Sequence, residues 1–156
     1  TMNRTIDSNN PLNLIDCFEE FTRPEVLEGD NQWRDDDGNL HNAVKKIDIW
    51  EFPKILIICL KRFDNFGRKR NDIIDFPIDN LDLTNYCIGY SKFKSYFELY
   101  GICNHTGGAG FGHYYSYCKY KDNNWYEFND RNISKISPNK LVTSSAYCLF
   151  YRKKNL

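Results

Sequence analysis

The sequence predicts an α+β fold in which one N-terminal helix precedes a mainly antiparallel β-sheet. Apolar residues recur at helical spacing near the start, at Leu14, Phe18 and Phe21. Beyond residue 44, apolar runs of strand length alternate with turn-forming stretches. The 156 residues are 41% hydrophobic and 16% aromatic, which is enough to build a single core.

The predicted helix lies between two prolines. Asn10 is a candidate N-cap, and Pro11 suits the first helical turn. Pro24 ends the helical pattern. The first ten residues, 1–10, are polar and carry no such pattern, so we expect a flexible terminus there.

A hairpin arm and a buried strand are predicted next. The arm begins near Trp33, and the stretch DDDGN at 35–39 is its turn. Ile47 and Ile49 then alternate with charged residues, which indicates a half-buried strand. The run KILIICLKRF (54–63) is almost continuously apolar and is typical of a strand in the centre of a sheet.

Four further strands are expected in the second half of the chain. Each is short and rich in aromatic or β-branched residues, and KDNN (121–124) is the turn between the second and third. Four such strands with short connections favour antiparallel pairing. The predicted strands are SYFELYGIC (95–103), HYYSYCKY (113–120), NWYEFN (124–129) and SAYCLFYRK (145–153).

Composition excludes several classes of function. Lys and Arg number 21 and balance 21 Asp and Glu, so the chain lacks the basic field of a nucleic-acid-binding protein. No apolar run approaches the roughly 18 residues of a membrane span, and the start has no signal-peptide pattern. We therefore expect a soluble intracellular protein of the cytoplasm or nucleus that binds neither nucleic acid nor membranes.

The six cysteines are scattered and contain no C-x-x-C pair, so reduced thiols are expected. Cys59, Cys103 and Cys148 lie inside apolar runs, where a thiol behaves as a small hydrophobe, and we expect them in the core.

His113 is the candidate general base. Gly107, Gly108, Gly110 and Gly112 crowd the loop before it. Such a loop has little stiffness, leaves room for an extended peptide beside the imidazole and can close over it. The alternative is a mobile surface loop followed by a histidine with no catalytic role.

Asn129 and Asp130 are candidate partners of that histidine. They follow a strand that is expected to pair back on the histidine strand. A histidine base needs its second ring nitrogen held by an oxygen. If the strand stays extended, only one of the two side chains faces His113. The alternative is an Asn-Asp turn that merely ends the strand.

None of the six cysteines is a convincing nucleophile for His113. Cys118 is five residues further along the same predicted strand, so it faces the other side of the sheet. At roughly 3.3 Å per residue it lies about 16 Å away. Hydrogen-bond contact is therefore excluded for this pair.

Six blocks of the sequence follow one another in a familiar order. They are DCFEEFTRPEVLEGDNQW, AVKKIDIWEFPKILIICLKRF, FPIDNLDL, YFELYGICNHTGGAGFGHYYSYCK, WYEFND and TSSAYCLFYRKK. Together they resemble the C-terminal part of the ubiquitin-specific proteases (peptidase C19 type), from about Leu12 to Lys154. The resemblance implies a papain-like cysteine protease fold, with a palm built on the sheet and a β-hairpin fingers arm. On this basis 11–156 is a catalytic-domain portion, with fingers at about 25–50 and palm at about 50–156.

The resemblance implies a cofactor-free deubiquitinase acting on ubiquitin and ubiquitinated proteins. Such enzymes cleave the (iso)peptide bond after the C-terminal glycine of ubiquitin. By position His113 matches the general base, Asn129 the orienting residue and Asp130 an adjacent polar residue. Two loops match blocking loops beside the ubiquitin tail, the glycine-rich one and the stretch 82–95. The expected substrate-binding residues are Gly107, Gly108, Gly110, Phe111, Gly112 and Tyr114.

The chain departs from the family pattern at two places. The family nucleophile lies in a box like GNTCYMN on a helical thumb, and these 156 residues contain no such box. We therefore expect an upstream thumb segment of the same protein to supply the cysteine. A non-catalytic ubiquitin-binding or scaffolding module is the alternative, and an unrelated β-sheet module is a third.

The second departure concerns zinc. Many members carry C-x-x-C in the arm, whereas this chain has Asp35 and Gly38 at the matching positions. Glycine has no ligand side chain, so no metal site is expected there. An oxygen-ligand site at the DDD stretch is an alternative to a solvated acidic turn.

Overall fold

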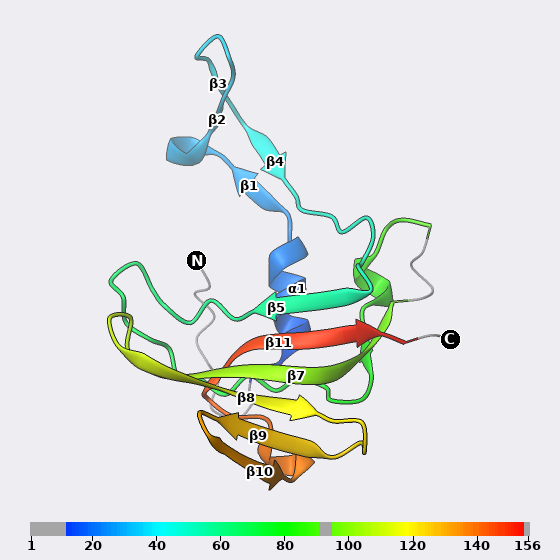
Figure 1. Cartoon of the computed structure of the whole chain (residues 1–156). Helices are drawn as coiled ribbons and strands as arrows, with labels where there is room; N and C mark the ends of the chain where they lie inside the picture. The colour runs from blue at the N-terminus through cyan, green and yellow to red at the C-terminus, as the bar shows by residue number, and fades with distance from the viewer. Residues whose placement is uncertain (1–11, 91–94, 155–156) are drawn as a thin grey trace.

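The computed structural model describes residues 12–90 and 95–154 and confirms the α+β class (Figure 1). Six strands pair in the order β10-β9-β8-β7-β11-β5, β6 pairs with β7, and every pairing in this sheet is antiparallel. The sheet strands are β5 (Ile55–Cys59), β6 (Leu81–Asp82), β7 (Tyr96–Gly107), β8 (Gly112–Lys119), β9 (Trp125–Asn129), β10 (Asn132–Ile136) and β11 (Ala146–Lys153). Short 3-10 turns lie at Gly29–Asn31, Thr84–Tyr86 and Pro138–Lys140.

The four strands predicted in the second half are confirmed as β7, β8, β9 and β11. Strand β10 was not predicted, because its sequence NISKI is largely polar and four of its five residues are exposed. The central position predicted for 54–63 is wrong, since β5 is the edge strand of the sheet. Its burial alternates along the strand, and Ile55 and Ile57 are 47% and 59% exposed. Although β5 is continuously apolar, only one of its two faces points into the core.

Helix α1 (Leu14–Thr22) begins three residues later than predicted. Asn13 is its N-cap: the Asn13 side chain accepts from the Asp16 N–H, and the Asp16 carboxylate accepts from the Asn13 N–H. This reciprocal capping box overrides the proposed cap at Asn10, which lies outside the described residues together with Pro11. Phe21, expected in the apolar stripe, is 54% exposed.

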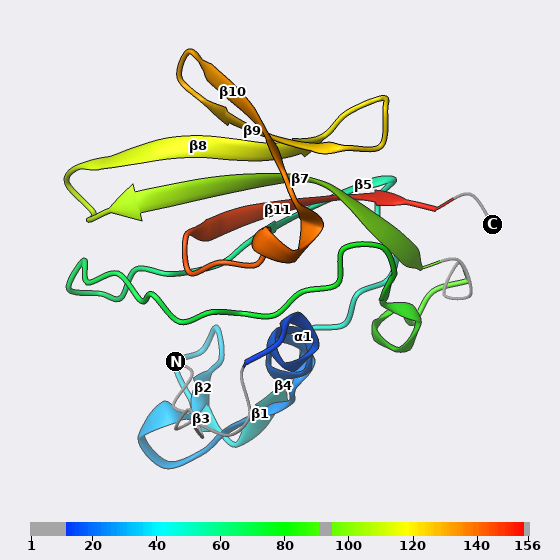
Figure 2. The same ribbon diagram turned by 90° about the horizontal axis from the view of Figure 1, so that it is seen from below.

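The core lies between α1 and one face of the sheet. Figure 2 shows α1 below the sheet, with the chain between β5 and β6 running between them. Phe18 of α1 packs edge-on against Phe52, and Phe52 packs in the same way against Phe97 of β7. Other buried members include Leu14, Leu60, Phe76, Leu81, Leu99, Leu149 and Tyr151.

The predicted arm is present as two short ribbons that project from the sheet (Figure 1). Its turn at 35–39 is confirmed. The alternating pattern around Ile47 does not continue as a strand, and Ile49 forms only an isolated bridge with Cys87. The ribbons are β1 (Glu25–Leu27) with β4 (Ala43–Lys45) and β2 (Trp33–Arg34) with β3 (Leu40–His41).

All six cysteines are free thiols. Cys59 is exposed, so its expected place in the core is wrong, and Cys103 and Cys148 are only half-buried. The reason is that they line the face of the sheet opposite to the core. Cys148 of β11 lies directly across from Cys59 of β5 and from Cys103 of β7.

Candidate active site

His113 is the second residue of β8 and emerges directly from the glycine-rich loop. Antiparallel pairing places it opposite Thr106 of β7. Its side chain is 45% exposed, so the imidazole is held at the surface and open to a reactant.

Asn129 contacts the imidazole of His113. It is the last residue of β9, which pairs with β8, and its Oδ1 lies 2.7 Å from Nε2 of the imidazole. A carbonyl oxygen only accepts, so Nε2 carries the proton of the neutral ring. Nδ1 then carries the lone pair of the neutral ring.

Asp130 also lies near His113. Its Oδ2 is 3.9 Å from Nε2, and its side chain is 77% exposed. Both residues approach the ring because Asp130 has a φ of 51°, a left-handed conformation that ends the extended strand. The strict alternation considered for an extended strand does not apply at this turn, so neither partner excludes the other.

Glu127 makes a further contact that the sequence interpretation missed. Its Oε1 accepts from Nδ2 of Asn129 at 3.4 Å. The available signal was spacing, since residues two apart on a strand share a face.

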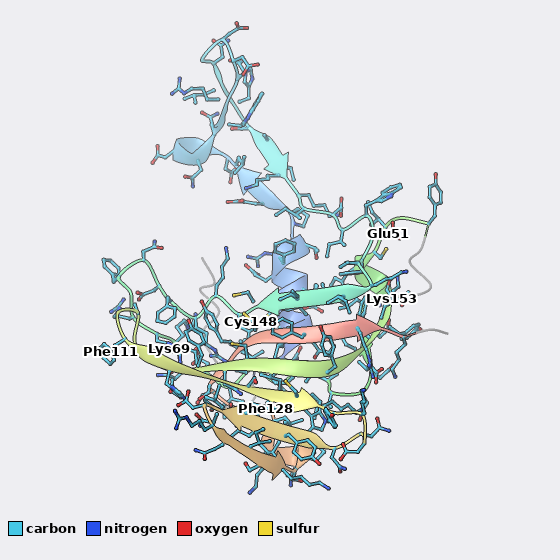
Figure 3. The ribbon with its side chains drawn as sticks, in the orientation of Figure 1. Glu51, Lys69, Phe111, Phe128, Cys148 and Lys153 are labelled. Atoms are coloured by element: carbon cyan, nitrogen blue, oxygen red, sulfur yellow. The ribbon has the colours of Figure 1, made fainter. Side chains whose placement is uncertain are left out.

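The glycine-rich loop joins β7 to β8 and presents Phe111 to solvent, 81% exposed, at the end of the sheet shown in Figure 3. Gly107 has a φ of 98°, which favours glycine. A Cβ on Gly112 would lie 2.2 Å from His105 Nε2 and 2.6 Å from the Thr106 carbonyl oxygen. Gly112 therefore allows close packing on His105, a reason different from the room beside His113 that its position suggested.

An aromatic cluster lies beside this loop and was also missed by sequence reasoning. Tyr114 packs on His105 with ring centroids 4.6 Å apart, and Phe63 and Tyr147 surround the same imidazole at 5.8 Å. Lys69 donates to the His105 carbonyl oxygen. Burial, with the Lys69 charge nearby, lowers the pKa of His105, which favours the neutral ring. We call His105, Phe63, Tyr114 and Tyr147 the aromatic platform.

The cysteines of the sheet are poorly placed to react with His113. Cys103 of β7 lies opposite Ser116 of β8. Ser116 is three residues from His113 along the strand, so Ser116 and Cys103 point to the other face of the sheet. Burial raises the pKa of Cys103, and it raises that of Cys148 to about 12 with a further contribution from Cys59. Cys17 on α1 also has a raised pKa because of burial. A thiol with a raised pKa is a weak nucleophile.

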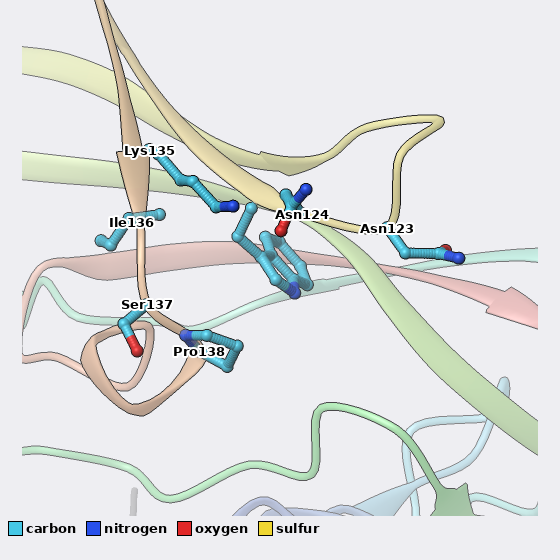
Figure 4. A pocket seen from close by; sticks show the side chains of 7 residues that line it. Asn123, Asn124, Lys135, Ile136, Ser137 and Pro138 are labelled. Carbon is cyan, nitrogen blue, oxygen red and sulfur yellow. The ribbon is translucent and has the colours of Figure 1, made fainter.

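A separate pocket of about 380 Å³ lies at the other end of the β8–β9 hairpin (Figure 4). It lies between the β8–β9 turn and the end of β10, whereas His113 and Asn129 lie at the opposite end of the hairpin. We do not assign it to the site. Its lining is Asn123, Asn124, Trp125, Lys135, Ile136, Ser137 and Pro138.

The arm does not fit the family-type zinc centre. The Asp35 carboxylate is already engaged by the Asn39 N–H and by His41 Nε2, each at 2.7 Å, and Gly38 has no side chain. Within 12–90 and 95–154 no cluster of three or more His, Cys, Asp or Glu could hold a metal ion.

In the same ranges no helix is long and apolar enough to cross a membrane.

Comparison with known proteins identifies the family. The family model "Ubiquitin carboxyl-terminal hydrolase" matches residues 4–151. Ubiquitin carboxyl-terminal hydrolase 8 of Arabidopsis thaliana is 40% identical over 148 residues, which is 91% of this chain and 17% of that protein. The human ubiquitin carboxyl-terminal hydrolase 15 is 36% identical over 92% of this chain and 15% of its own length.

Solved structures agree with this assignment. The SAGA Ubp8/Sgf11/Sus1/Sgf73 DUB module bound to ubiquitin aldehyde matches with a TM-score of 0.77 and 32% identity, over 93% of this chain and 34% of that one. The same module with a Ubp8 variant bound to monoubiquitin gives 0.77 and 32% over 93% and 33%. The chain thus spans about a third of these solved chains and a sixth of the curated relatives. On its sequence and its papain-like α+β fold, this chain belongs to the ubiquitin carboxyl-terminal hydrolase family of deubiquitinating thiol proteases.

Proposed function

We propose that this chain is the C-terminal part of the catalytic domain of a ubiquitin-specific cysteine protease, in which His113 is the general base. The observation that carries the proposal is the 2.7 Å contact between His113 Nε2 and Asn129 Oδ1 in a chain of this family. The nucleophilic cysteine belongs to an upstream segment of the same protein. Residues 11–156 form this portion, with fingers at about 25–50 and palm at about 50–156.

The reaction is acyl transfer from ubiquitin to the cysteine and then to water. His113 Nδ1 takes the thiol proton, and the thiolate attacks the carbonyl carbon of ubiquitin's last glycine. The carbon–nitrogen bond breaks as the imidazolium gives its proton to the leaving amine of the modified lysine. Water, deprotonated by His113, then cleaves the thioester, which releases the ubiquitin carboxylate and restores the thiol.

Asn129 and Asp130 divide the supporting role. The Asn129 carbonyl oxygen holds the Nε2–H, but a neutral amide does not balance the charge of an imidazolium. Asp130, with its carboxylate 3.9 Å from Nε2, supplies negative charge when His113 is protonated. Because Asp130 is 77% exposed, solvent weakens this interaction.

The glycine-rich loop and the aromatic platform are proposed to hold the ubiquitin tail. The tail ends in Gly-Gly and needs a narrow channel without protruding side chains. Gly107, Gly108 and Gly110 provide such a wall, and Gly112 lets the loop pack closely on the aromatic platform. Phe111 and Tyr114 offer exposed aromatic surface beside it.

The first prediction concerns His113. His113→Ala in the complete enzyme removes the general base, so kcat for a ubiquitin conjugate falls by about 10²–10⁴. Ubiquitin affinity stays within a few-fold, because the imidazole is a small part of the contact. Turnover and calorimetric binding measure the two effects, and His41→Ala on the arm is a control of the same chemistry. Substantial turnover by the His113 variant would refute the assignment.

The location of the nucleophile is tested with ubiquitin carrying a thiol-reactive C-terminus. We expect the intact mass of an adduct on the upstream part of the polypeptide. An adduct on one of the six cysteines of this chain would overturn the placement argued above. Ubiquitin binding by the complete protein without any adduct would instead support the non-catalytic ubiquitin-binding module.

A further inference from the structure

We infer that Glu127 is a positioning residue: it fixes the orientation of the Asn129 amide and thereby the tautomer of His113. The inference extends the proposed function, because it assigns a role at the site to a residue to which the family resemblance gave none. It rests on the proposed function only for its effect on turnover. Its effect on the imidazole is a property of this chain alone.

The three side chains are joined by two successive contacts. Glu127 Oε1 accepts from Asn129 Nδ2 at 3.4 Å, and Asn129 Oδ1 faces His113 Nε2 at 2.7 Å. Glu127 and Asn129 are two apart on β9 and so share one face of the strand. Both are half-buried, whereas Asp130 is exposed, so Glu127 is the better shielded carboxylate beside this pair.

The backbone holds Glu127 in place from both sides. In the sheet register it lies between Tyr117 of β8 and Ser134 of β10. A residue between two hydrogen-bonded neighbours has a fixed backbone, unlike a residue in a loop. The Cα of Glu127 is therefore fixed two residues from Asn129, within reach of the Asn129 amide.

The chemistry of an amide makes this contact decisive. An asparagine side chain has one accepting end and one donating end, and rotation by about 180° exchanges them. Either end of Asn129 can meet an imidazole nitrogen, because a neutral ring offers a donor or an acceptor. A carboxylate only accepts. Glu127 therefore requires the NH₂ group on its own side and leaves the carbonyl oxygen for His113.

The consequence for His113 is one preferred tautomer. With Oδ1 facing it, Nε2 must carry the proton, and Nδ1 keeps the lone pair needed by a general base. With the amide reversed, Nε2 would accept and Nδ1 would carry the proton. The nitrogen intended for the nucleophile would then be blocked, the kind of tautomer error that severely impairs histidine bases.

The test is the tautomer itself, read from ¹⁵N chemical shifts of histidine-labelled chain at a pH of about 8, where an ordinary imidazole is neutral. The chain has three histidines, so His113 is assigned by comparison with His113→Gln. We expect the Nε2–H form in the unaltered chain and in Glu127→Gln, whose carbonyl can still accept. Glu127→Lys only donates and is expected to shift His113 to the Nδ1–H form.

An Asn129→Asp background separates orientation from structural damage. A carboxylate has two accepting oxygens and no reversed state, so Glu127→Lys should leave the tautomer unchanged in that background. If Glu127→Lys does not fold, Glu127→Met, which neither donates nor accepts, is expected to give a mixture of the two tautomers. An unchanged Nε2–H form in Glu127→Lys or Glu127→Met with Asn129 present would overturn the inference.

The effect on turnover is the second readout. In the complete enzyme, Glu127→Lys is expected to lower kcat by about 10²-fold or more with KM nearly unchanged, and Glu127→Gln to restore it to within a few-fold. If the complete wild-type protein shows no turnover, the proposed function fails while the tautomer test still decides the role of Glu127. If turnover is present and the tautomer never moves, only the role of Glu127 fails.

Discussion

The imidazole of His113 is held from one nitrogen and left open at the other. Asn129 engages Nε2 at 2.7 Å, and nearly half of the His113 side chain remains exposed. This is the arrangement that a general base needs before a nucleophile arrives, because reorientation of the ring at the moment of reaction would raise the barrier. Precision at the site therefore comes from the pairing of two strands.

Gly112 sets how closely the glycine-rich loop approaches β7. Gly112→Ala would place a methyl carbon 2.2 Å from His105 Nε2 and 2.6 Å from a backbone oxygen, so the neighbours must shift. We expect the free energy of unfolding to fall by about 1–3 kcal/mol. Urea denaturation measures it.

Gly110→Ala is the matched control, because a Cβ at Gly110 meets nothing within 4 Å. Its stability should stay within about 0.5 kcal/mol of the original chain. Equal losses for the two variants would show that the loop is generally intolerant of side chains and that the contact with His105 has no special weight.

At the residue scale the sequence was sufficient for part of the site. The glycine run before His113 and the strand before Asn129 predicted which residues meet. The approach of Asp130 was not predictable, because it depends on the left-handed φ of one residue at the turn. His105 was hidden for another reason, since its neighbours Phe63 and Tyr147 are far apart in the sequence and meet only after the strands pair.

Hydrogen bonds hold the tip of the arm together in the region where many family members carry zinc-binding cysteines. Asp35 receives the Asn39 N–H on one oxygen and contacts His41 on the other, and Arg34 donates to the Gly38 carbonyl oxygen at 2.6 Å. All these groups lie within one turn of chain. The tip is therefore held by local contacts.

The stability of this hydrogen-bonded tip should depend on pH. Hydrogen bonds from His41 and then from the Asn39 backbone lower the pKa of Asp35 below its ordinary value of 3.8. A depressed carboxyl pKa stabilises the folded turn fully above the ordinary value, and the contribution is lost as the pH falls through the lower value. We expect the turn to persist from neutral pH to about 4 and to loosen below that.

The Asn39 amide shift in an NMR pH titration follows this transition. Asp35→Asn should move the loosened state to neutral pH, whereas Asp36→Asn removes a charge from the same turn and should leave the titration in place. An Asn39 shift that does not change with acid would contradict the assigned role of Asp35.

The strands were predicted best where apolar and polar residues alternate with a clear period of two. Strands β7, β8, β9 and β11 alternate and are bounded by turns, so their existence followed from the pattern. Strand β5 was misplaced because a continuous apolar run looks the same whether one face or both are covered. On its second face, Ile55 and Ile57 remain 47% and 59% exposed.

At the scale of the whole molecule, the face of the sheet opposite to the core is the largest-scale feature to explain, and we call it the open face. Ile55 and Ile57 lie on it, and Ile57 pairs across the ladder with Phe150 of β11. Exposed apolar surface of this kind commonly marks an interface. We expect this chain to self-associate through it.

Ile57→Glu tests this expectation. Loss of one buried isoleucine contact, about 1.5–3 kcal/mol, should weaken self-association of the isolated chain by about tenfold to a hundredfold. Sedimentation velocity measures the effect. Ile73→Glu is the control, because Ile73 is similarly exposed at 55% but lies in the segment between β5 and β6. Equal effects of the two changes would show that net charge, and not this face, controls association.

The order of the strands also has a consequence for synthesis on the ribosome. Strand β11 is the last to be translated, yet it lies between β5 and β7. At roughly 5–20 residues per second, β5 waits for about 5–20 s before its partner emerges. During that interval the nascent chain presents unpaired strand edges, which are templates for aggregation. A chaperone that shields the emerging chain should therefore raise the yield of folded protein more than one added after release.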